Sequence, residues 1–206
     1  MSERAGAADG SVPDLSDLSD VSNVLLIAPS LGSHGRTVCF DLLAQTPPAE
    51  TNVLVVSYTQ TPGELVDDWT DHVGAPPLRG GVVSVGQGEA GAEDSPWAVK
   101  SVENPSDLTG VGIELSEFLS GLASAAEEGE HVAVCFNSVT SLLQYADLQR
   151  AFRFLHVVTG RIKTVGGVGH FHLDPDAHDP QTLATLKGLF DAVIEVEDDG
   201  TREIQR

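Results

Sequence analysis

The stretch Asn23-Val-Leu-Leu-Ile-Ala-Pro-Ser-Leu-Gly-Ser-His-Gly-Arg-Thr37 decides the fold of this chain. It opens with a continuous apolar run over residues 23–28, which is typical of a strand covered on both faces in a parallel sheet. A glycine-containing loop over residues 29–35 follows the run. Apolar residues at helical spacing then predict a helix over residues 37–43. The order strand, loop, helix indicates the first unit of an α/β fold.

The same alternation continues along the chain. Thr61, Pro62 and Glu64 form a capping box with proline at the first helical position, so they predict a helix that ends near His72. A helix over 108–128 is expected to end at a Gly129 cap. The further predicted strands are 52–57, 81–85, 131–136 and 165–173, the further helices are 148–159 and 180–189, and a hairpin joins 191–197 to 201–205 through an Asp-Gly turn. This pattern predicts a mostly parallel sheet with helices on both faces and a terminal antiparallel hairpin.

The chain divides into a tail and one domain. Residues 1–22 are small, polar and acidic, so we predict a flexible acidic tail before a single domain over 23–206. The spacing of Leu15, Leu18 and Val21 allows the alternative of one amphipathic helical turn that docks on the domain. A long polar stretch over 86–107 is interpreted as a loop, whose Trp97 either anchors a partner or covers the sheet edge.

Composition limits the partners and the compartment. Asp and Glu number 31 against 11 Lys and Arg, which gives a formal charge of −20. Such a surface suits a cytosol rich in salt, where the Debye length falls to about 3 Å in molar salt. The charge argues against nucleic-acid binding, and no apolar run is long enough to span a membrane. We expect a cytoplasmic, halophilic protein with a protein partner or self-association, whose Cys39 and Cys135 are reduced core residues.

The loop after the first strand is a degenerate phosphate-binding motif. A P-loop has the pattern GxxxxGK[ST], in which backbone amides hold phosphates, the lysine reaches the β- and γ-oxygens and the hydroxyl binds Mg²⁺. In this sequence Gly35 and Thr37 match the pattern. Ser30 stands in place of the first glycine, and Arg36 stands in place of the lysine.

Because of this loop and the stretches that follow it, the chain resembles the RecA/KaiC/RadA superfamily of P-loop ATPases. The resemblance extends over nearly all of the chain after the predicted tail. The stretch 53–65 resembles the second strand and helix of KaiC-type proteins, which usually carry acidic residues where Thr59 and Gln60 stand. The stretch 132–143 resembles the Walker B strand, with Asn137 in place of its aspartate. More narrowly, residues 142–159 and 170–179 resemble an uncharacterised haloarchaeal family of KaiC-related proteins, often labelled HTR-like.

These departures remove the chemistry that the resemblance implies. The wide guanidinium of Arg36 does not fit where a lysine ammonium fits, and Asn137 cannot hold the Mg²⁺ hydration shell as a carboxylate does. Thr59 and Gln60 occupy the lost catalytic acid positions, because neither can accept a proton from water at neutral pH. We therefore expect a non-hydrolysing pseudo-ATPase with a regulatory or scaffolding role. No catalytic residue is assigned, and no cofactor follows firmly; ATP and Mg²⁺ are the cofactors that the resemblance implies. The candidate residues for weak nucleotide or phosphate binding are Ser30, Gly32, His34, Gly35, Arg36, Thr37, Asn137 and Ser138.

Two other functions stay open on the sequence. One is a slow or partner-activated ATPase of KaiC type, in which Arg36 and Gln60 replace the usual residues. The other is a metal-dependent enzyme that uses His170, His172 and His178. A histidine-rich strand end more often supplies hydrogen bonds and helix caps, so that interpretation is preferred to a metal site.

Overall fold

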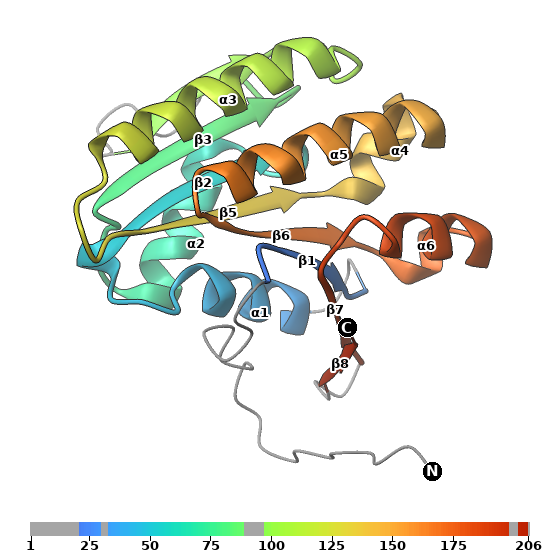
Figure 1. Ribbon diagram of the computed structural model, residues 1–206, viewed down its shortest axis with the longest axis horizontal. Helices are drawn as coiled ribbons and strands as arrows, with labels where there is room; N and C mark the ends of the chain where they lie inside the picture. The colour runs from blue at the N-terminus through green and yellow to red at the C-terminus, as the bar shows by residue number, and fades with distance from the viewer. Residues whose placement is uncertain (1–20, 30–32, 89–96, 198–201, 206) are drawn as a thin grey trace.

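The computed structural model describes residues 21–29, 33–88, 97–197 and 202–205. In these ranges the strands form one eight-stranded sheet in the order β4-β3-β2-β5-β6-β1-β7-β8 (Figure 1). Each neighbouring pair is parallel except β7 with β8, which is antiparallel. The strands are β1 (Asn23–Ile27), β2 (Thr51–Ser57), β3 (Arg79–Val85), β4 (Trp97–Val102), β5 (His131–Asn137), β6 (Val168–Leu173), β7 (Ala192–Val196) and β8 (Arg202–Gln205). The predicted α/β architecture is confirmed.

Helices cover both faces of the sheet (Figure 1). One face carries α1 and α2, and the opposite face carries α3, α4, α5 and α6. The helices are α1 (Ser33–Leu43), α2 (Pro62–Val73), α3 (Leu108–Ala125), α4 (Val139–Tyr145), α5 (Leu148–Thr164) and α6 (Pro180–Lys187), with 3-10 turns η2 (Pro48–Glu50) and η3 (Pro175–Ala177). All five residues of β1 are buried between these layers, as its unbroken apolar run predicts.

The helix starts follow the capping residues. The Thr61 hydroxyl accepts a hydrogen bond from the Glu64 amide, and the Glu64 carboxylate accepts one from the Thr61 amide. Asp147 and Asp179 accept bonds from the first-turn amides of α5 and α6. Each cap satisfies amides that have no partner within their helix. The sequence located these three starts correctly.

Several predicted boundaries and elements were wrong. Helix α3 ends at Ala125 because Ala126 is already extended, and Gly129 takes its left-handed φ of 95° in the turn before β5. Helix α1 starts at Ser33, four residues before the predicted start, and α5 runs to Thr164. Because α5 is longer than predicted, β6 begins at Val168 instead of residue 165. The stretch 86–107 contains strand β4, and the short helix α4 follows β5.

Trp97 covers the sheet edge. The residue is 4% exposed, and its ring packs edge-on against Trp69 of α2, with the ring centroids 5.6 Å apart. It also lies directly over Gly80, where a Cβ atom would come within 2.4 Å of the indole. The side chain is therefore a core residue, and it is not exposed for a partner.

Some expectations concern parts of the chain that the structure does not describe. Leu15 and Leu18 of the predicted tail, and the Asp-Gly turn between β7 and β8, lie outside the described residues. Val21 lies inside them and packs, partly buried, against the apolar cluster of α1, β1 and β7. Among the described helices, none combines the length and the apolar character that a membrane crossing requires.

Candidate functional site

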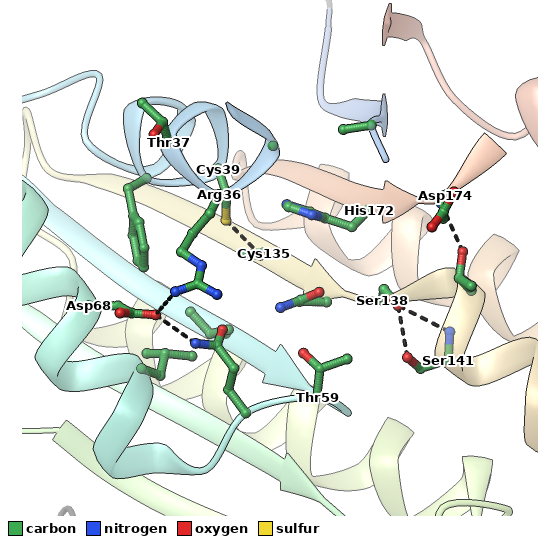
Figure 2. Close-up of a pocket in the computed structure, with 18 of the residues that line it drawn as sticks. Arg36, Thr37, Cys39, Thr59, Asp68, Cys135, Ser138, Ser141, His172 and Asp174 are labelled. Atoms are coloured by element: carbon green, nitrogen blue, oxygen red, sulfur yellow. Dashed lines mark hydrogen bonds and ion pairs between the residues drawn. The ribbon is translucent and has the colours of Figure 1, made fainter. Parts of the chain in front are cut away.

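A cavity of about 900 Å³ opens where β1, β2, β5 and β6 end, beneath α1 (Figure 2). In a parallel sheet, ligands bind at this carboxyl edge. The described lining residues come from α1, α2, α4 and the ends of these strands. They include the sequence candidates Gly35, Arg36, Thr37, Thr59, Gln60, Asn137, Ser138 and His172, together with Cys39, Asp68, Asp71, His72, Cys135 and Asp174.

The degenerate loop contributes its second half to this cavity. Ser30 and Gly32 lie outside the described residues, and His34 is exposed on α1, outside the lining. Gly35 is buried, and a Cβ atom there would lie 3.0 Å from the Cβ of Ala28. A glycine therefore lets α1 start close against the end of β1. This packing accounts for the glycine without any bound phosphate.

Arg36 crosses the cavity to α2. Its Nη1 lies 3.1 Å from the Oδ2 of Asp68, which also accepts a 2.7 Å hydrogen bond from the Nε2 of Gln60 (Figure 2). The Ser57 hydroxyl fixes the backbone of Gln60 with bonds to both its amide and its carbonyl. Arg36, at the position of the motif lysine, and Gln60, at the position of a catalytic acid, thus both contact the Asp68 carboxylate. Sequence reasoning missed Asp68, although it stands one helical turn after Glu64 on a helix beside the loop.

The Walker B position carries amide and hydroxyl chemistry. Asn137 ends β5, its side chain lines the cavity, and its carbonyl accepts a 2.7 Å hydrogen bond from the Tyr58 amide. The Asn137–Ser138 peptide bond is cis. Ser138 caps α4, where its hydroxyl accepts a bond from the Ser141 amide at 3.1 Å. Thr59 is exposed, and its amide bonds to the Ser57 hydroxyl. This group contains no carboxylate that could hold Mg²⁺ or accept a proton.

Acidic side chains dominate the charge of the cavity. Among the described lining residues, Arg36 is the one guanidinium or ammonium group, whereas Asp68, Asp71 and Asp174 supply three carboxylates. His72 also lines the cavity, and its Nε2 lies 2.8 Å from a carboxylate oxygen of Asp41. A triphosphate would meet repulsion from these carboxylates. The lining therefore opposes a highly charged anion.

The predicted histidine group divides into two parts. His170 and His172 lie together on β6, but His178 lies elsewhere, and its Nε2 pairs with the Thr140 hydroxyl at 3.1 Å. Burial lowers the pKa of His178, against the opposing effect of Asp174 and Asp179. The structure instead brings Cys39 and Cys135 to His170 and His172. Both cysteines are buried, as expected, but their contact with the histidines was not predicted.

Comparisons with known proteins support the fold. The uncharacterized protein PH0321 from Pyrococcus horikoshii, solved with an unknown peptide, superposes with a TM-score of 0.60 and 13% identity over 89% of this chain and 82% of that one. The flagellar accessory protein FlaH from Methanocaldococcus jannaschii superposes with a TM-score of 0.55 and 13% identity, covering 85% of this chain and 71% of the other. Identities this low show the fold alone, and that fold is RecA-like.

The sequence comparisons are narrower. No curated protein matches the chain. One family model matches residues 21–196, which is most of the chain and nearly the whole described fold. The chain therefore belongs to the family of unknown function DUF7504.

Proposed function

We propose that this protein is a non-hydrolysing RecA-like protein with a regulatory or scaffolding role in a halophilic cytoplasm. Its cavity keeps the position of a nucleotide site without the groups that bind and cleave a triphosphate. The observation that carries the proposal is the contact of Arg36 and Gln60 with one carboxylate, that of Asp68.

Electrostatics supports this proposal. In an active P-loop, a lysine contacts the β- and γ-phosphates and a carboxylate holds the Mg²⁺ hydration shell. Here the guanidinium of Arg36 is directed toward α2, and Asn137 offers only a neutral amide. An incoming phosphate would have to displace Asp68 from Arg36 while two more carboxylates line the same cavity. Each of these effects weakens nucleotide binding, and the missing carboxylate also removes metal activation.

A scaffolding role is consistent with the retained architecture. The core, the helix caps and the close approach of α1 to β1 are intact although the charged groups have been replaced. One protein of the same fold, PH0321, was solved with a peptide. By analogy with that complex, the activity that we propose here is the binding of another polypeptide.

Thermal unfolding with and without Mg·ATP in molar KCl tests the proposal. A ligand at about one hundred times its Kd stabilises by about 2.7 kcal/mol, which for a chain of this size raises Tm by about 5–11 °C. We expect millimolar Mg·ATP to leave Tm unchanged within about 1 °C. A rise of the larger size that Arg36→Ala abolishes would contradict the proposal and favour the slow or partner-activated ATPase.

A matched pair of variants tests the role of Asp68. Asp68→Ala and Asp67→Ala remove the same charge from adjacent positions of α2, but only Asp68 contacts Arg36, and Asp67 is exposed. The ion pair itself contributes about 0–1 kcal/mol to stability, because Arg36 is 62% exposed. We expect tripolyphosphate to raise the Tm of Asp68→Ala more than that of Asp67→Ala. Equal responses of the two variants would refute the idea that Asp68 keeps Arg36 from phosphate.

A further inference from the structure

Four side chains with metal-binding atoms meet under α1. Cys39 comes from α1, Cys135 from β5, and His170 and His172 from β6, and their ligand atoms all lie within 4.8 Å of one another. Cys135 and His170 are partners in the register of neighbouring parallel strands. His172 lies two residues after His170 and so points to the same sheet face. Figure 2 shows Cys39, Cys135 and His172 converging at the floor of the cavity.

The distances suit one tetrahedral ion. The Sγ atoms of Cys39 and Cys135 are 3.3 Å apart, and the Nε2 of His170 is 3.2 Å from the Sγ of Cys39. Around Zn²⁺, two sulfur ligands lie about 3.8 Å apart, and a sulfur and a nitrogen about 3.6 Å apart. The two short pairs need to separate by about 0.5 Å, and ligand atoms as far as 4.8 Å apart need to approach by about 1 Å, to hold the ion. A disulfide would instead require the two sulfur atoms to approach to about 2.05 Å.

One nitrogen atom of this buried cluster has no hydrogen-bond partner among the described residues. Three of its members are buried and His172 is partly buried, and the two cysteines belong to an apolar cluster with residues of α1 and β2. The Nε2 atom of His172 is buried and forms no hydrogen bond with any residue that the structure describes. A buried nitrogen without a partner costs about 1–3 kcal/mol, so a partner at this point is expected.

The two thiols lie in different electrostatic environments. The hydrogen bond from Cys135, together with the nearby His170 and His172, lowers the pKa of the Cys39 thiol. Burial and the adjacent Cys39 sulfur raise the pKa of Cys135. A divalent cation would stabilise both thiolates at once, because thiolates and neutral imidazoles are the forms that bind metal.

We propose that Cys39, Cys135, His170 and His172 bind one Zn²⁺ ion as a closed structural centre. Two thiolates and two imidazoles in a tetrahedron are a donor set that selects zinc. Four protein ligands leave no position for a reacting water, so the ion is structural rather than hydrolytic. It links α1, whose first turn lines the cavity, to the two central strands β5 and β6. This proposal does not depend on the function proposed above.

Metal analysis of the full chain tests this site. Protein purified under reducing conditions, supplied with Zn²⁺ and dialysed, is expected to retain one zinc per chain by elemental analysis. The variants Cys135→Ser and His172→Ala are expected to lose most of it. His156→Ala is the matched control because His156 is exposed on α5, and it is expected to retain the full stoichiometry. Zinc should also raise the Tm of the wild-type chain but not that of Cys135→Ser.

A second measurement covers variants that fail to fold. Co²⁺ added to the wild-type chain is expected to give the absorption of a tetrahedral ion with thiolate charge transfer, and stoichiometric Zn²⁺ should remove it. Three results would overturn the proposal. They are a wild-type chain without zinc after reconstitution, a disulfide between Cys39 and Cys135 that persists in reductant, and full zinc retention by His172→Ala.

Discussion

The contact between Trp97 and Gly80 makes a sharp prediction about stability. A Cβ atom on Gly80 would lie 2.4, 2.7 and 2.9 Å from three indole carbons of Trp97. Carbon atoms pack at about 3.5–4.0 Å, so Gly80→Ala forces the buried ring to move by about 1 Å or more. Such overpacking costs about 2–3 kcal/mol, and the smaller entropy of the unfolded alanine chain offsets about 0.5–1 kcal/mol. The net loss of about 1–2.5 kcal/mol lowers Tm by about 2–10 °C for a chain of this size.

Gly160→Ala is the matched control for this substitution. Gly160 lies on the exposed side of α5, and a Cβ atom there would meet nothing within 4 Å. In a helix, alanine is about 0.5–1 kcal/mol more favourable than glycine, so this variant should raise Tm by about 1–4 °C. Thermal unfolding in molar KCl, followed by circular dichroism, measures both variants. A Tm of Gly80→Ala that equals or exceeds the Tm of the wild-type chain would refute the packing of Trp97 against Gly80.

Two further predictions concern helix caps. Asp147→Ala removes the side-chain acceptor of the Arg150 amide at 2.8 Å and should cost about 0.5–2 kcal/mol, measured by urea unfolding, whereas an unchanged midpoint would contradict this cap. Hydrogen bonds from the Thr61 amide and hydroxyl lower the pKa of Glu64 in the folded chain. Its contribution is therefore complete above the unfolded pKa of about 4.3 and is lost as the pH falls through the lowered folded pKa. Glu64→Gln should flatten the fall of Tm below about pH 5, and parallel pH profiles for the two proteins would exclude this linkage.

Local signals were sufficient to predict most of the fold. The buried run of β1 and the capping box of α2 are encoded within a few neighbouring residues, so both could be predicted before the structure was known. Strand β4 could not be predicted, because four of its six residues are exposed or half-buried at the sheet edge and therefore do not form an apolar run. The residues on both sides of this strand are also polar. Helix α4 has only seven residues, which is too few for a clear helical period.

The site was less predictable because its contacts are long-range. Cys39 lies 96 residues from Cys135 and 131 residues from His170 in the sequence. Only the spacing of His170 and His172 on one strand gave a local signal, and it did not indicate which residues would join them. In the same way, Arg36 and Asp68 meet because α1 and α2 lie side by side on one face of the sheet. The spacing of residues within one helix or strand does not indicate which residues of other elements they contact.

The most direct test of the central claim is the rate of phosphate release from Mg·ATP by the purified chain in molar KCl, with Arg36→Ala as the matched background. The account predicts equal and negligible release from both proteins, because the one guanidinium of the described lining is paired with Asp68, Asn137 replaces the Walker B carboxylate, and the neutral Thr59 and Gln60 stand at the catalytic acid positions. Sustained release by the wild-type chain that Arg36→Ala abolishes would contradict it.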